Sequence, residues 1–175
     1  MPMNATYHGP SDLPEVIPVF PLAGALLLPR GQMPLNIFEP RYLAMIDDAL
    51  RDGHRLIGMI QPDAAHGDGD TPPLFKIGCV GRITQLAESG DGRYLIELTG
   101  VARFRVEEEL KVATLYRQAR VTYAPFADDF VARGWQVLDI MAPGKLEAHA
   151  PNPDAVLVDG VLHYPPGGVD QPPLF

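Results

Sequence analysis

Between residues 13 and 126 the apolar positions follow short strand-like runs, except in one stretch where their spacing is that of a helix. Five apolar residues fall at helical spacing and form one stripe: Tyr42, Met45, Ile46, Ala49 and Leu50. Pro40 suits the first helical turn because it has a fixed φ and no N–H. Gly53 suits the position just after a helix end. The pattern therefore predicts a helix over residues 40–52.

The other apolar runs have the length and flanking turn residues of strands. The predicted strands occupy residues 16–20, 34–38, 56–60, 76–87, 93–98, 101–106 and 116–123, and residues 25–28 form a further apolar run closed by a turn. Pro18 predicts an edge or a strand start, because proline cannot donate to a central ladder. The Thr99-Gly100 pair predicts a turn with a positive φ at Gly100.

These elements predict a mainly β (α+β) domain of antiparallel strands with one inserted helix. Its core should consist of residues on the apolar face of each element: Ile46, Ile83, Ile96, Leu98, Phe104 and Val121. We expect a flexible leader at residues 1–12, the β domain at 13–126, and a Pro/Gly-rich tail at 127–175. The tail prediction rests on seven Pro and five Gly within residues 131–175.

The composition favours a folded domain and argues against several classes of partner. Apolar residues make up 46% of the 175 residues, enough for a packed core, and the formal net charge of −8 disfavours nucleic acid as a partner. The single cysteine, Cys79, cannot form an internal disulfide and is expected to be a buried thiol, which fits a cytoplasmic location. The amino terminus lacks the basic and apolar regions of a signal peptide, and no apolar run has membrane-spanning length.

Two charged stretches are candidates for chemistry. Glu39 and Arg41 flank Pro40 and could be a catalytic pair, but a helix start explains them, with Arg41 pairing to Glu39, Asp48 or a loop. Residues 66–70 read HGDGD, which is too short a ligand set for a hard cation and predicts a solvated loop. We therefore predict no catalytic residue, no metal and no cofactor.

Two separated blocks carry a resemblance to a known family. The first is IPVFPLAGALLLPRGQMPLNIFEPRYLAMIDDAL, at residues 17–50. The second joins FKIGCVGRI (75–83) with GRYLIELTGVARFRV (92–106). Over residues 13–126 the chain resembles the Lon protease amino-terminal domain family, which includes single-domain bacterial members. The resemblance implies a PUA-like pseudo-barrel with the helix packed against one end.

The family's helical lobe is not matched after Phe126, where a Pro/Gly-rich tail stands in its place. Whether that tail is native, truncated or frame-shifted is left open. The sequence has no GxxxxGK[ST] phosphate loop, and its last sixty residues contain no serine for a Ser–Lys dyad. The resemblance therefore implies a non-enzymatic part in substrate selection, not ATPase or protease activity.

The leading functional hypothesis is a module that binds unfolded or extended polypeptide, or a protein partner. The candidate surface consists of Leu28, Met33, Leu35, Ile37 and Phe38, because apolar residues are dense there and exposed apolar patches mark interaction sites. Edge strands could also accept an extended peptide by β-augmentation. No membrane partner is expected, and weak self-association fits the same surface. A small hydrolase with an unrecognised site and an RNA-binding PUA-like module are the alternatives.

Overall fold

The computed structural model describes residues 5–51, 53–63, 65–66 and 71–131, together with two short strands further along the chain. The chain divides into two compact units, Met1–Val131 and Ala132–Phe175. In the second unit, β7 (Val156–Val158) and β8 (Val161–His163) pair as an antiparallel two-stranded sheet. The predicted irregular tail otherwise lies outside the described residues from position 132 onward.

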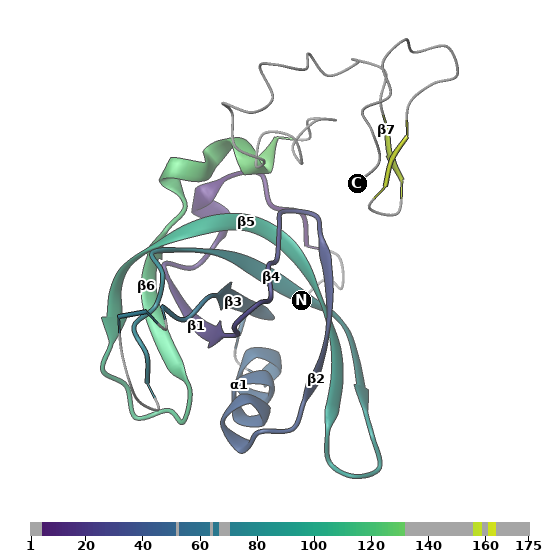
Figure 1. Ribbon diagram of the computed structural model, residues 1–175, viewed down its shortest axis with the longest axis vertical. Helices are drawn as coiled ribbons and strands as arrows, with labels where there is room; N and C mark the ends of the chain where they lie inside the picture. Colours follow the sequence, from purple (N-terminus) through teal and green to yellow (C-terminus); the bar gives the residue numbers. More distant parts are fainter. Residues whose placement is uncertain are drawn as a thin grey trace. The chain divides into compact units, whose positions relative to one another are not determined.

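Six strands of the first unit form one sheet that closes on itself (Figure 1). They are β1 (Val16–Pro21), β2 (Gln32–Ile37), β3 (Leu56–Ile60), β4 (Ile77–Glu88), β5 (Tyr94–Leu110) and β6 (Arg117–Thr122). Their order is β2-β5-β4-β3-β1-β6, and β6 pairs with β5 as well, which completes the ring. All pairs are antiparallel except β1 with β3. The mainly β pseudo-barrel predicted from the sequence is confirmed.

Helix α1 (Pro40–Arg51) covers one end of this ring. It begins where predicted, and the Glu39 carbonyl accepts the first bonds, from the Tyr42 and Leu43 N–H groups at 2.9 Å each. Four of the five residues of the predicted stripe are buried, namely Tyr42, Met45, Ile46 and Ala49, and the fifth, Leu50, is partly buried against the same cluster. Short 3₁₀ helices lie at either end of the first unit, η1 (Pro10–Asp12) and η2 (Ala124–Phe130).

The core is built from two clusters of buried side chains. One gathers around α1 and includes Met45, Ile46, Ile83 and Leu98. The other is centred on Phe104, which is fully buried. All six residues predicted for the core are buried, because each lies on the inward side of its strand or helix.

The predicted turn at Thr99-Gly100 is wrong, because β5 runs through it as one continuous strand. Gly81 pairs with Gly100 and Val80 pairs with Ala102, so Val101 is the extra residue of a β-bulge. Gly100 does not have a positive φ. Glycine is needed there because a Cβ would lie 2.0 Å from the Leu28 carbonyl oxygen.

Residues 25–28 form no strand and lead into a turn before β2, as predicted. The edge position predicted for the strand that contains Pro18 is wrong. β1 is not an edge strand, because it lies between β3 and β6. Pro18 is tolerated because pairing with β3 begins only at Val19, so the proline faces a partner on one side.

A seam remains where β2 and β6 pair one after the other with the same side of β5. Within the seam the Arg103 N–H donates to Asp129 Oδ2 at 2.9 Å, in place of a strand carbonyl. The Arg103 guanidinium holds the same carboxylate through Nε and Nη2 at 2.9 and 2.7 Å. Arg30 Nη2 in turn donates to the carbonyls of Asp129 and Val131. Hydrogen bonds from Arg103 and Arg30 thereby hold η2 over the seam between β2 and β6.

Candidate functional site

The five residues predicted for the binding surface divide between the two faces of β2. Ile37 is 2% exposed and belongs to the core, and Met33 and Leu35 are partly buried against it. Leu28 is half-buried in the turn before the strand. Phe38 is 60% exposed. The alternation of strand side chains thus brings Met33, Leu35 and Ile37 together on the inward face and leaves Phe38 as the exposed member.

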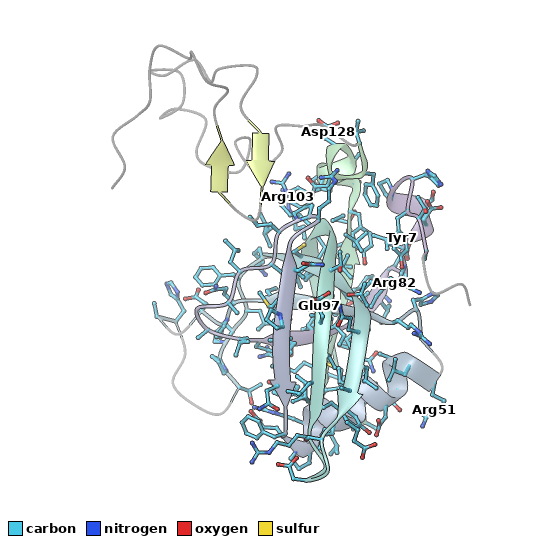
Figure 2. The ribbon with its side chains drawn as sticks, turned by 90° about the vertical axis from the view of Figure 1, so that its right-hand side faces the viewer. Tyr7, Arg51, Arg82, Glu97, Arg103 and Asp128 are labelled. Carbon is cyan, nitrogen blue, oxygen red and sulfur yellow. The ribbon has the colours of Figure 1, made fainter. Side chains whose placement is uncertain are left out.

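The outward face of β2, β5 and β4 is a three-stranded surface, which Figure 2 views with Glu97 labelled. Glu97 lies at its centre, and its Oε1 accepts long hydrogen bonds of 3.4 Å from side chains of Gln32, Thr84 and Gln85. The hydroxyls of Thr84 and Thr99 are 3.1 Å apart in the next row. The Glu97 carboxylate is therefore held by neutral donors on the two strands that flank β5, and this part of the face is polar.

The face becomes apolar toward the β4–β5 hairpin. Leu95 is 51% exposed and pairs across the sheet with Asn36 on one side and Ala87 on the other. Phe38 follows directly at the end of β2, and the Arg93 guanidinium carbon lies 5.9 Å from its ring centroid. Sequence reasoning missed Leu95. Its alternation with Ile96 indicated an outward side chain, but its neighbours on β2 and β4 depend on sheet order, which the pattern does not carry.

The outer edge of β2 is open. Among the described residues β2 pairs only with β5. The Gly100 N–H donates to the Gly31 carbonyl at 2.8 Å, which sets the alternation of backbone groups along the strand. Met33, Leu35 and Ile37 consequently bond to β5, while the backbone groups of the residues between them point away from it. Pro34 fits this register, because its missing N–H would face the open edge.

A cleft of about 290 Å³ lies beside the polar end of the face. Its charged lining comes from Arg30, Arg82 and Asp129. Arg82 is 5% exposed, and its Nη1 donates to the Tyr7 hydroxyl and to the His54 carbonyl at 3.0 Å each. These groups tie the amino-terminal segment and η2 to the barrel, so they serve the fold.

The other sequence candidates are accounted for by local contacts. Arg41 Nε donates to Glu39 Oε2 at 2.8 Å, and both side chains are nearly half exposed. In the candidate metal loop, His66 Nδ1 lies 2.8 Å from Asp63 Oδ2, and residues 67–70 lie outside the described part. No group of three or more metal-ligating side chains occurs among the described residues.

Cys79 is 3% exposed within the core, as predicted. Burial raises the pKa of its thiol well above the ordinary value, because the thiolate would lose its hydration. A thiol in this state is a poor nucleophile. Within the described residues no helix is long and apolar enough to cross a membrane.

Comparison with known proteins decides the family. Residues 16–149 match the family model described as the ATP-dependent protease La (LON) substrate-binding domain. The chain belongs to this family. The match to the Lon substrate-binding domain extends past Phe126, where the resemblance read from the sequence ends.

The relatives of this Lon substrate-binding domain include much longer proteins that are named Lon protease. It is 37% identical over 111 residues to "Lon protease 2" of Myxococcus xanthus and 33% identical over 111 residues to "Lon protease" of Anaeromyxobacter dehalogenans. Each alignment covers 63% of this chain and 13% of the relative. A crystal structure described as a Lon N-terminal domain protein from Xanthomonas campestris superposes with a TM-score of 0.50 at 28% identity, covering 62% of this chain and 59% of that one.

Proposed function

We propose that this domain binds unfolded or extended polypeptide without catalysing a reaction on it. The observation that carries the proposal is the exposed apolar end of the outward face, Phe38 with Leu95, in a chain of the Lon substrate-binding family. Exposed apolar clusters gain free energy when they lose water to a partner. The net negative charge argues against nucleic acid, and the cross-strand neighbours of Leu95, Asn36 and Ala87, are both uncharged, which is consistent with an apolar ligand.

The size of the effect separates an apolar contact from a charged one. Burying about 100 Å² of apolar surface on Phe38 and Leu95 contributes about 2.5 kcal/mol, at about 25 cal/mol per Å². The exposed Glu39–Arg41 ion pair is worth only ~0–1 kcal/mol. Polypeptide binding should therefore depend on the two apolar side chains far more than on Glu39.

The test is a fluorescence titration with a labelled polypeptide kept unfolded by reduction and carboxymethylation of its cysteines. We expect Phe38→Ser combined with Leu95→Ser to weaken binding by at least about tenfold. Leu115→Ser is the matched control, because Leu115 is 70% exposed on a different loop. Glu39→Ala should leave the affinity within about threefold of wild type. The proposal fails if the double variant binds like wild type, or if Glu39→Ala alone abolishes binding.

A further inference from the structure

We propose that the polypeptide pairs with the open edge of β2 as an additional antiparallel strand. This inference rests on the proposed function and names its mode of contact: recognition of main-chain N–H and C=O groups in a fixed register. β2 is the end strand of the sheet order and pairs with β5; Figure 1 shows the two strands together on one side of the barrel. Gln32, Pro34 and Asn36, the residues whose backbone groups face away from β5, are all exposed.

The side chains of β2 leave this edge unprotected by charge. Natural edge strands commonly carry lysines or other charges that prevent another chain from pairing. The strand from Gln32 to Ile37 reads QMPLNI and contains none. Its only obstacle is Pro34, which lacks a donor but keeps its acceptor. A paired strand would therefore gain two hydrogen bonds at Gln32, one at Pro34 and two at Asn36.

The pleat of β2 also fixes which side chains the added strand presents to each face. Residues opposite Gln32, Pro34 and Asn36 share the outward, polar face, and these are the residues that hydrogen-bond to β2. Residues opposite Met33 and Leu35 lie on the inward face, where both side chains are partly buried and apolar. The best partner is consequently an extended, uncharged segment in which polar and apolar residues alternate.

Backbone methylation of a peptide tests this register directly. The probe is a fluorescein-labelled eight-residue peptide in which threonine alternates with valine. Threonines should face outward and bond to β2, so N-methylation of every threonine should abolish binding. N-methylation of every valine should leave binding within about threefold, because those N–H groups point away from β2. Each lost backbone hydrogen bond is expected to weaken binding about fivefold.

Two substitutions on the edge probe the same contacts from the protein side. Pro34→Ala restores a donor and should tighten binding about fivefold, whereas Asn36→Pro removes one and should weaken it by a similar factor. Neither change alters the inward face. Pro40→Ala is the control, because it adds an N–H in the first turn of α1 and not on the edge. Thermal unfolding of each variant verifies that it is folded.

The outcomes separate this inference from the proposed function. Edge pairing is overturned if both methylated peptides bind as well as the unmodified one, or if Pro34→Ala and Asn36→Pro shift affinity in the same direction. Binding of the unmodified peptide in that case leaves the proposed function standing. No binding of either the unmodified peptide or the unfolded polypeptide contradicts both.

Discussion

Replacing Gly100 with alanine should destabilise the domain by about 2–4 kcal/mol. The new Cβ would lie 2.0 Å from the Leu28 carbonyl oxygen, and real Cβ atoms essentially never approach closer than 3.0 Å, so one backbone must move by about 1 Å. That shift would break two bonds of 2.8 Å, from the Gly100 N–H to the Gly31 carbonyl and from the Arg30 N–H to the Gly100 carbonyl. Each costs about 0.5–1.5 kcal/mol, and more if a buried group stays unpaired.

The assay is urea unfolding followed by far-UV circular dichroism at equilibrium. Gly90→Ala is the matched control, because Gly90 is near the hairpin tip with nothing within 4 Å of an added Cβ. We expect the control to stay within about 0.5 kcal/mol of wild type. A cost for Gly100→Ala below about 1 kcal/mol would refute the close approach of β5 to the turn before β2.

Phe104→Ala should cost about 3–5 kcal/mol in the same assay because Phe104 is fully buried, and a cost under about 1 kcal/mol would contradict that placement. Asp129→Asn should cost about 1–3 kcal/mol, since it weakens three bonds to Arg103, whose side chain is one-third exposed; urea unfolding with unchanged midpoint would contradict this. Cys79→Ala should flatten the pH dependence of stability. Burial raises the folded thiol pKa, so above the unfolded pKa of about 8.5 only the unfolded chain loses the proton and wild-type stability falls with rising pH. Equal slopes between about pH 7.5 and 9.5 in both proteins would count against this reasoning.

The sequence was sufficient for elements whose signal is local. The α1 stripe, the proline at its first turn and the alternation around Ile96 and Leu98 predicted burial correctly, because each depends on neighbours a few residues away. The family resemblance supplied the closed sheet, which no local pattern specifies.

Features that depend on distant contacts could not be predicted. Glycine is a common turn residue, and only the close approach of the Leu28 carbonyl explains why Gly100 lies inside a strand. The residues of the candidate binding surface also depend on distant contacts and were predicted only in part. Apolar density singled out residues 28–38, but the pairing of Leu95 with Asn36 and Ala87 decides which apolar side chains meet outside the core. The edge of β2 likewise follows from sheet order and not from its own residues.

The Asp129 carboxylate in the seam of the barrel makes the backbone amide of Arg103 a selective reporter of whether η2 is attached. The Arg103 N–H is bonded to Asp129 on η2, whereas the amides paired between β5 and its neighbouring strands are bonded within the ring. Hydrogen–deuterium exchange at Arg103 therefore measures the detachment of η2, and exchange in the paired strands measures opening of the sheet. Because Arg30 also holds the carbonyls of Asp129 and Val131, the point at which the first unit ends has a local stability of its own, separable from that of the barrel.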